Sequence, residues 1–377
     1  MRKRNSTIDL SRLKPPRRVC LIKPSSLGDV VQALPVLCAL KDLWPDACFT
    51  WVVNRNLSDL LAGHRCLDEI IEFDRAGRGP GRFRVVVDLA RRLREGGFDL
   101  VCDLQGLLRT GLMTAATRAP VRVGLSTSRE HAHLFYTHAI PVSDPDMPAV
   151  ERYLLLAEQC GANTQDARFD VFIPPDDAAW AEAQLAALQR PAVVVNPGAR
   201  WTTKRWPAEH FGAIAARAAR EFGAGMVIVG SADERAVADV VARHVGDGCL
   251  NLAGETSLKQ LAALLERADL VLTNDSGPMH LAAAVRTPVV GIFTCTSPRR
   301  AGPHGSGHRV VATAVDCAAS YLKQCDRLDC MRELTPELVW PDVAEKLTQM
   351  ARVSARSAGV AAPHTKIARS SPVSDTR

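Results

Sequence analysis

Short apolar runs alternate with helical patterns along most of the chain, and small or polar residues separate them. Residues 18–23 form the first run, which leads into a turn containing serine and glycine and then into a helical pattern through Leu40. This alternation is typical of strand–helix units on a parallel sheet, and it predicts an α/β protein. The further strands that we expect are residues 49–54, 100–104, 121–125, 192–196, 226–230, 270–274 and 289–293, and the further helices are 82–94, 151–160, 208–222, 234–244, 257–266, 279–285 and 335–350.

The strand–helix units fall into two series, separated by a segment rich in proline, aspartate and alanine. Two successive series predict two Rossmann-like domains that face each other across a cleft. We expect the last helix to pack back toward the first domain, and the serine-, alanine-, proline- and arginine-rich end to be disordered. The expected parts are a basic flexible N-terminus (1–16), a first Rossmann-like domain (17–165), an interdomain connection (166–190), a second Rossmann-like domain (191–334), the last helix (335–353) and the tail (354–377).

Composition narrows the class of protein. Of 377 residues, 23% are charged and 47% hydrophobic, which is an ordinary globular balance. A net charge of +6 suits acidic small molecules or an anionic membrane surface, and is too small to indicate nucleic acid. Eleven cysteines, an odd number scattered through apolar segments, favour reduced thiols in the cytosol over a disulfide framework. No run approaches the roughly 20 apolar residues that cross a bilayer, so we expect a cytoplasmic protein that is at most peripheral at a membrane.

Ligands of open parallel sheets bind beyond the carboxyl ends of the strands, which makes the strand-to-helix turns the first candidates for chemistry. The first turn, residues 23–29, has two serines, one glycine and Asp29 at the start of the helix. It is neither a Walker loop nor a GxGxxG turn. Ser26 and Asp29 have the spacing of a capping box, and on these residues alone that structural role is favoured over a catalytic one.

The second turn, residues 196–207, follows a strand that looks fully buried. Its small residues leave backbone amides open to phosphate oxygens, Arg200 and Lys204 add positive charge, and two tryptophans lie beside these cations. The alternative is a surface loop whose cations are merely solvated. The proline–glycine turn and the flanking aromatics favour phosphate binding.

The third turn, residues 272–280, runs from the end of a strand into a helix with Pro278 in its first turn. Free amides and the positive helix end form an anion site, and His280 follows within one turn. Alternatively, Asp275 and Ser276 only cap the helix and His280 is a buried structural histidine. Two phosphate-binding turns in one domain predict a diphosphate ligand there.

Five segments resemble, in order, those of glycosyltransferase family 9, the ADP-heptose:lipopolysaccharide heptosyltransferases. They read IKPSSLGDVVQALPVLCALK, DLQGLLRTGL, NPGARWTTKRWPAEHF, TNDSGPMHLAAAVRTPVVGIF and CMRELTPELV, and they extend over about residues 18–350. Several ordered motifs are far more specific than one alone. The resemblance implies a GT-B fold, with the acceptor bound by the first domain and the nucleotide-sugar donor by the second.

The resemblance also implies roles for individual residues. Asp29 matches the general base for the acceptor hydroxyl, and Lys204 matches the lysine that neutralises the donor phosphates. The implied donor-binding residues are Ala199, Arg200, Glu234 (ribose), Thr256 (near adenine), Asp275, Ser276, Gly277 and His280, and the implied acceptor-binding residues are Lys23, Ser26 and Arg129.

The implied reaction is a single displacement that inverts the anomeric carbon, without metal or other cofactor. ADP-heptose would be the donor, and lipid A–Kdo or a heptosylated core of lipopolysaccharide the acceptor, with contact at the cytoplasmic face of the inner membrane. A carboxylate at a helix N-terminus is stabilised as the anion, so Asp29 would be a weak base until water is excluded.

Other possibilities remain open. The chain could use another nucleotide sugar, or it could be an inactive nucleotide-sugar-binding protein. An oxidoreductase is less favoured because no glycine-rich dinucleotide turn is present. Asp144-Pro145-Asp146 spells DxD, the metal motif of another transferase class, but its proline-rich setting favours an ordinary turn. Cys317, Cys325 and Cys330 are irregularly spaced, which favours unliganded thiols over a zinc site.

Overall fold

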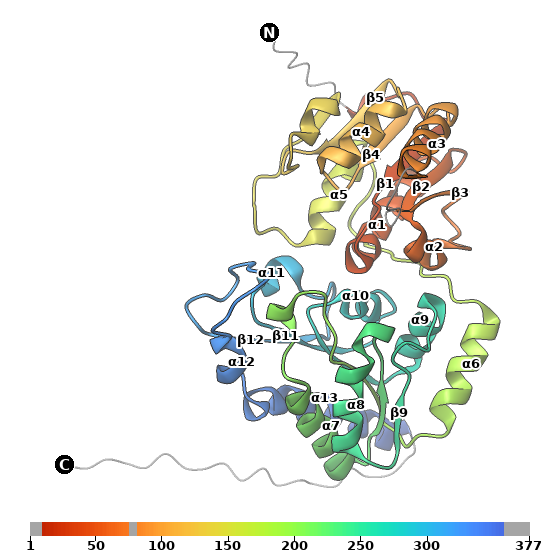
Figure 1. Cartoon of the computed structure of the whole chain (residues 1–377). Coiled ribbons are helices and arrows are strands. Elements are labelled where there is room, and N and C mark those ends of the chain that lie inside the picture. The colour runs from red at the N-terminus through yellow and green to blue at the C-terminus, as the bar shows by residue number, and fades with distance from the viewer. Residues whose placement is uncertain (1–9, 75–80, 358–377) are drawn as a thin grey trace.

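The computed structural model describes residues 10–74 and 81–357, without the side chains of residues 81–83 and 353–357. It contains two six-stranded sheets, one above the other in Figure 1, and every strand pairing is parallel. We call the parts built on these sheets the N-terminal half and the C-terminal half. The N-terminal half contains β1 (Arg18–Ile22), α1 (Leu27–Leu43), β2 (Cys48–Asn54), α2 (Arg55–Leu61), β3 (Glu69–Phe73), α3 (Gly81–Glu95), β4 (Leu100–Asp103), α4 (Leu108–Ala116), β5 (Val121–Leu125), η2 (Ala132–Phe135), β6 (His138–Ile140) and α5 (Ala149–Gln159), preceded by the 3-10 turn η1 (Leu10–Arg12).

The C-terminal half begins after a connecting segment that includes α6 (Pro175–Ala186). Its elements are β7 (Ala192–Asn196), η3 (Thr202–Lys204), α7 (Ala208–Phe222), β8 (Gly225–Ile228), η4 (Ala232–Glu234), α8 (Arg235–Val245), β9 (Cys249–Asn251), α9 (Leu258–Arg267), β10 (Leu270–Asn274), α10 (Gly277–Ala284), β11 (Val289–Phe293), α11 (Pro298–Ala301), β12 (Arg309–Ala312), α12 (Asp329–Glu333) and α13 (Pro336–Ser357).

The two sheets share one topology. The first runs β3-β2-β1-β4-β5-β6 and the second β12-β11-β10-β7-β8-β9. If the strands of each half are numbered from one, the first sheet has the order 3-2-1-4-5-6. The second sheet has the same order when it is read from its β9 edge. This is the order of a dinucleotide-binding Rossmann sheet. The strand order reverses between β1 and β4 in one half and between β7 and β10 in the other. Ligands of such sheets bind beyond these strand ends, where all three predicted turns lie.

Central strands match the sequence predictions closely, and edge strands do not. The expected strands at 121–125, 192–196, 270–274 and 289–293 are confirmed to the residue, and all five residues of β7 are buried. The strands β3, β6, β9 and β12 were not predicted. Each lies at or near an edge of its sheet, and β3 and β12 carry charged residues such as Glu69, Glu72 and Arg309 where they are partly exposed.

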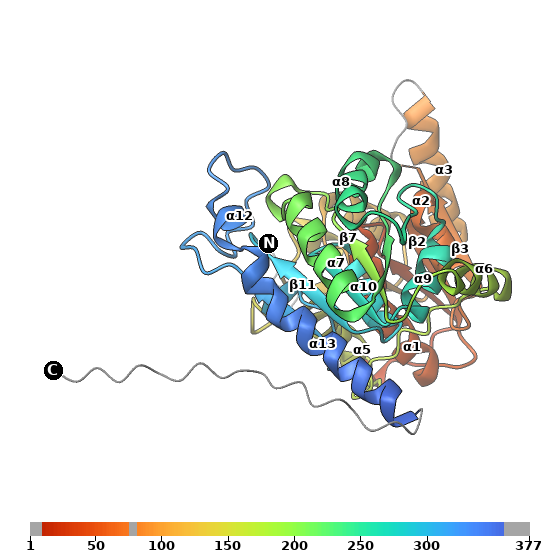
Figure 2. The same ribbon diagram turned by 90° about the horizontal axis from the view of Figure 1, so that it is seen from below.

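The prediction for the last helix was wrong. Among the described residues, α13 makes its main contacts with α7, β10 and β12 of its own half. Figure 2, seen from below, shows α13 crossing the side of the C-terminal half that is turned away from the N-terminal half. Its apolar residues Val339, Val343 and Leu347 are buried in the core beneath β10 and α7, which provides the nearest apolar surface. The predicted ends were partly wrong: within the expected flexible N-terminus (1–16), Leu10–Arg12 form η1 and Leu10 is buried, and within the expected tail (354–377), residues 354–357 continue α13. The rest of these two segments, residues 1–9 and 358–377, lies outside the described residues.

The halves meet where α1 and α10 begin. A Cβ on Gly28 of α1 would lie 2.4 Å from Cδ2 of His280, and a Cβ on Gly277 of α10 would lie 2.8 Å from Cδ2 of Leu27. Each helix therefore has a glycine where the other helix approaches. Lys259 of α9 adds a second connection, because its Nζ donates to the carbonyl oxygens of Leu60 (3.1 Å) and Phe172 (2.6 Å).

Candidate active site

Asp29 lies in the first turn of α1, where both oxygens of its carboxylate accept hydrogen bonds. The amide and the hydroxyl of Ser26 donate to Oδ2 at 3.1 and 2.8 Å. The hydroxyl of Tyr153, on α5, donates to Oδ1 at 3.1 Å. The predicted capping box is thus present, and the Ser26 hydroxyl also bonds the Asp29 carboxylate directly. The side chain of Asp29 remains 39% exposed, so it can still reach a ligand.

Lys23 lies beneath Asp29 and is only 2% exposed. Its Nζ lies 3.5 Å from Asp29 Oδ1 and donates to Tyr153 Oη at 2.8 Å and to the carbonyl oxygen of Leu104 at 3.1 Å. The expectation that Lys23 lines the acceptor surface is therefore corrected, because its ammonium group is buried and fully bonded.

These neighbours set the charge of Asp29. Burial by itself raises the pKa of a carboxyl, but the charge of Lys23 and the hydrogen bonds from Ser26 and Tyr153 outweigh it and hold the pKa of Asp29 well below its usual range. Burial likewise opposes the charge on Lys23, yet Asp29 and Tyr153 raise the pKa of that lysine above its ordinary value. Asp29 is therefore an anion at any physiological pH.

The second and third turns are joined by a buried ion pair. Lys204 Nζ lies 2.5 Å from Asp275 Oδ2, which also accepts the hydroxyl of Thr296 at 2.6 Å. Asp275 is 4% exposed and Lys204 17%, so the lysine is the partner that a ligand can reach. The ring of Trp201 lies 4.8 Å from Lys204 Nζ and favours its charge.

Two asparagines hold the backbone of these turns together. Asn196 Nδ2 donates to the hydroxyl of Ser276 (2.8 Å), the residue that precedes α10. Asn274 Nδ2 donates to the carbonyl oxygen of Pro197 (2.8 Å), and its Oδ1 accepts from the amide of Trp206 (3.1 Å). The second and third turns are therefore neighbours in the structure. Together with the N-terminus of α10 they form a cationic cradle (residues 196–206 and 274–280).

His280 lies between the two halves. It is buried against Gly28, and its Nε2 is 4.0 Å from Asp275 Oδ1. Burial lowers the pKa of this histidine, although the charges of both Asp275 and Asp29 act on the ring in the opposite direction. The imidazole is therefore neutral near pH 7. It lies close enough to Asp29 in one half and Asp275 in the other for both charges to act on it.

The remaining expected donor residues surround the cradle. Glu234 packs against Gly198, since a Cβ on that glycine would lie 2.2 Å from Glu234 Cδ, and its Oε2 accepts from Ser231. Thr256 is half-buried in the loop after β9, next to the Glu234 turn, where the amide of Gly254 donates to the carbonyl oxygen of Gly230 at 2.9 Å. Ala199 is buried, whereas Arg200 is exposed.

On the acceptor side, Ser26 and Arg129 are both exposed. Arg129 follows β5, and its amide donates to the carbonyl oxygen of Gly106 at 2.8 Å, which brings its loop beside the end of β4. Arg109 lies closer to the first turn, with Nη2 3.4 Å from the hydroxyl of Ser25. The structure therefore places Arg129 near the end of β4, one strand from the first turn.

Sequence reasoning missed three residues that build the site. Tyr153 bonds both Asp29 and Lys23, Thr296 bonds Asp275, and Asp103 accepts from the amides of Gln105 and Gly106 (2.9 and 3.0 Å) and shapes the turn after β4. Burial raises the pKa of Asp103. The only available signal was a tyrosine on the apolar face of α5, in a chain with three tyrosines.

The structure shows the contacts of the two sequence motifs that were considered as metal sites, the DxD turn and the three late cysteines. Asp144 pairs with Arg299 at 2.6 Å and Asp146 accepts from the hydroxyl of Ser297 at 3.1 Å, so the DxD turn contacts α11 of the other half. Among the described residues, Cys317, Cys325 and Cys330 do not converge as metal ligands, and they range from exposed to buried.

The paired Rossmann-like sheets, meeting at their switch points, define the GT-B class of glycosyltransferases. A family 9 glycosyltransferase from Veillonella parvula superposes with a TM-score of 0.75 at 24% identity, over 91% of this chain and 99% of that one. The structure of Escherichia coli ADP-heptose lipopolysaccharide heptosyltransferase II gives 0.72 at 23% identity, over 88% and 99%.

Residues 86–331 match the family described as glycosyltransferase family 9 (heptosyltransferase). The chain belongs to this family and is a glycosyltransferase. It is 28% identical to a lipopolysaccharide core heptosyltransferase of Haemophilus influenzae over 79% of this chain and 84% of that one. It is 29% identical to lipopolysaccharide heptosyltransferase 1 of Pseudomonas aeruginosa over 82% and 87%. No helix of the described residues is long and apolar enough to cross a membrane.

The charge of Asp29 gives a testable pH dependence. Because its pKa in the folded protein lies below the ordinary 3.8, its contribution to stability is complete above pH 3.8 and is lost as the pH falls below that value. In urea unfolding, Asp29→Asn is expected to lower the free energy of unfolding at pH 7 and to differ less from the wild type at pH 3. The exposed Asp247 provides the control, and Asp247→Asn should change little at either pH. A deficit for Asp29→Asn that stays constant across this range would contradict the proposed Lys23–Asp29–Tyr153 arrangement.

Proposed function

We propose that this glycosyltransferase moves a heptose from ADP-heptose to the inner core of lipopolysaccharide. The observation that carries the proposal is the position of His280, which belongs to the cationic cradle and packs against Gly28, so that the charge of the neighbouring Asp29 acts on its ring. A base and a diphosphate site that face each other across one imidazole are what a direct transfer needs. The names of the relatives supply the particular sugar and acceptor, which the geometry does not select.

In this proposal, Asp29 accepts the proton of the acceptor hydroxyl as that oxygen attacks the anomeric carbon. The bond from that carbon to the diphosphate breaks on the opposite face, so the configuration inverts. Lys204 and the amides at the start of α10 meet the charge that develops on the leaving ADP. For this, Lys204 would turn from Asp275 toward the phosphate, and Thr296 would keep Asp275 bonded.

The remaining assignments follow the resemblance. Glu234 would contact the ribose hydroxyls, Thr256 would line the adenine pocket, and Ser26 and Arg129 would contact the acceptor. Lys23 and Tyr153 would hold Asp29 in place and keep it ionised. The low pKa of Asp29 implies that it takes the proton only as the new bond forms, when the attacking hydroxyl has become strongly acidic.

A ligand-dependent melting experiment with a panel of nucleotide sugars tests the donor and the base together. ADP-heptose should raise the melting temperature more than UDP-, GDP- or ADP-glucose does, because binding to the folded state stabilises it. Asp29→Asn should keep this response and lose transfer by at least about 100-fold, within the range usual for a general base. ADP release should require acceptor in the wild type.

A larger rise in melting temperature with another nucleotide sugar would contradict the assignment of ADP-heptose as the donor. Transfer by Asp29→Asn at the wild-type rate would contradict the assignment of Asp29 as the general base. Binding of ADP-heptose with no acceptor-dependent ADP release from the wild type would favour the inactive binding protein.

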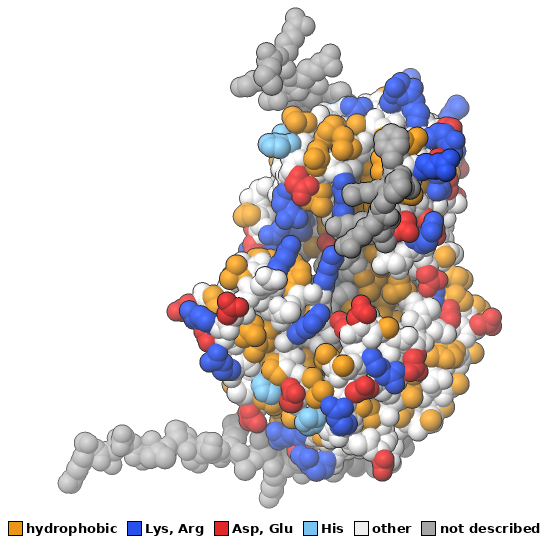
Figure 3. Space-filling model, viewed as in Figure 1, with side chains coloured by type: hydrophobic (Ala, Val, Ile, Leu, Met, Phe, Trp, Pro, Cys, Tyr) orange, Lys and Arg blue, Asp and Glu red, His pale blue; other side chains and the backbone are white. Residues whose placement is uncertain are grey.

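We also propose that the protein works in the cytoplasm at the membrane surface, where a lipid-linked acceptor is found. Val86 on α3, Leu108 and Leu112 on α4, and Leu134 on η2 are exposed, and α4 packs against both α3 and η2, so we assign these side chains to one apolar patch. Figure 3 shows hydrophobic side chains gathered on the N-terminal half with basic side chains beside them. An apolar area with a basic border suits an anionic bilayer surface.

Vesicle co-sedimentation tests this surface with a matched pair of variants. Leu112 in the patch and Leu338 on the C-terminal half are both 52% exposed. Leu112→Glu should weaken binding to phosphatidylglycerol vesicles by about fivefold or more, since about 1 kcal/mol of apolar burial is lost and a negative charge is added. Leu338→Glu should leave binding unchanged. Equal losses in both variants, or no binding by the wild type, would reject this surface.

A further inference from the structure

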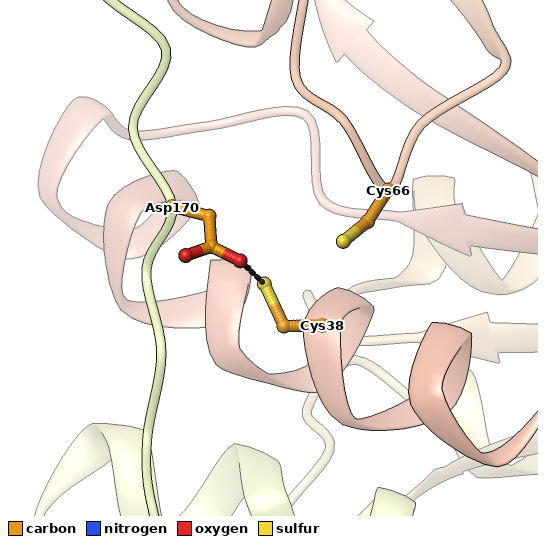
Figure 4. A group of neighbouring side chains, drawn as sticks. All are labelled: Cys38, Cys66 and Asp170. Carbon is orange, nitrogen blue, oxygen red and sulfur yellow. Dashed lines mark hydrogen bonds between the residues drawn. The ribbon is translucent and has the colours of Figure 1, made fainter.

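Three side chains far from the active site converge where the N-terminal half meets the connection between the halves. Cys38 is on α1, Cys66 is in the loop between α2 and β3, and Asp170 is in the segment that leads to α6. Figure 4 shows both sulfur atoms and the carboxylate pointing toward one another. The three candidate ligand atoms lie within 4.8 Å of each other, and Cys38 Sγ is 3.6 Å from Asp170 Oδ2.

This spacing matches the edges of a tetrahedral zinc site. With Zn–S at about 2.3 Å and Zn–O at about 2.1 Å, tetrahedral angles put a sulfur and an oxygen about 3.6 Å apart. Two thiolates also select the class of metal, because calcium and magnesium take oxygen ligands. Both cysteines are almost fully buried, whereas the Asp170 side chain is 22% exposed and offers a route of entry.

The charges around the three ligands balance when a divalent cation is added. Two thiolates and one carboxylate carry three negative charges, and the cation together with Arg65 carries three positive ones. Arg65 donates from Nε and Nη2 to Asp170 Oδ2 at 2.9 and 2.6 Å, so it holds the carboxylate in place beside the two cysteines. Charge balance matters because unpaired charges are costly at a buried site.

His64 lies next to Cys66 in the chain, but both nitrogens of its ring already have hydrogen-bond partners. Its Nδ1 accepts from the amide of Cys66 at 3.2 Å, and its Nε2 lies 3.2 Å from the carbonyl oxygen of Phe169. The imidazole therefore fixes the loop and the connection relative to each other and is not counted as a ligand. Three protein ligands leave the fourth position to water.

We propose that Cys38, Cys66 and Asp170 bind a thiophilic divalent cation of the zinc class, which fastens the connection to α1. The cation would join three segments that are distant in the chain. Cys38 is nine residues after Asp29 on the same helix, about 14 Å along its axis, so the cation takes no part in transfer. This proposal is independent of the donor and acceptor proposed above.

The test is the metal content of the full-length protein, purified with a thiol reductant and measured by mass spectrometry of the metals. About one zinc per chain is expected, and Cys66→Ser and Asp170→Asn should each lower it at least fivefold. Asp170→Asn keeps the size of the side chain, and Asn tolerates the left-handed backbone at this position (φ 46°). Cys160→Ser, at a cysteine buried at the end of α5, is the matched control and should retain the metal.

Cobalt(II) provides a readout that does not depend on activity or on the stability of a variant. The wild type should show a thiolate-to-cobalt charge-transfer band, weaker in Cys66→Ser and unchanged in Cys160→Ser. Absence of stoichiometric metal, absence of the band, or equal metal loss in Cys160→Ser would overturn the proposal. A Cys38–Cys66 disulfide in a protein that takes up no metal under reducing conditions would overturn it as well.

Discussion

The meeting of two helix N-termini is the contact on which the active site depends. The starts of α1 and α10 approach so closely that Gly28 and His280, and Gly277 and Leu27, leave no room for a further methyl group. Each helix start carries partial positive charge, so two of them face to face repel unless anions lie between them. Asp29 at one helix start and Asp275 before the other supply that negative charge, and His280 separates the two carboxylates.

Each half then pairs its carboxylate with one lysine, and the two pairs differ in how accessible the lysine is. Lys23 is buried and bonded on every side, so it can only hold Asp29 in place and keep it ionised. Lys204 is held by one carboxylate and lies closer to the surface, so it can exchange that partner for a phosphate. The same topology in the two halves thus places a fixed carboxylate on one side and an accessible cation on the other, which in the proposed mechanism are the base and the phosphate-binding group.

The sequence predicts the parts of this arrangement that are local. The strands 192–196 and 270–274 are apolar up to their last one or two residues and appear as expected, and Asn196 and Asn274 at their ends join the turns that follow. Contacts between distant segments carry no periodic signal. That is why Tyr153, the contacts of Asp144 and Asp146 with α11, and the convergence of Cys38, Cys66 and Asp170 could not be predicted. The placement of α13 failed for a related reason, since an amphipathic helix does not specify which of two apolar surfaces it covers.

Coupling between Gly28 and His280 measures the central contact most directly. In kcat/KM for transfer, Gly28→Ala should cost about fivefold or more, because its Cβ would overlap the imidazole ring and overpacking typically costs about 1–3 kcal/mol. With His280→Ala already present, space for the methyl group exists, so adding Gly28→Ala should cost nothing further. An equal loss from Gly28→Ala in both backgrounds would show that the two helix starts do not meet in the working enzyme.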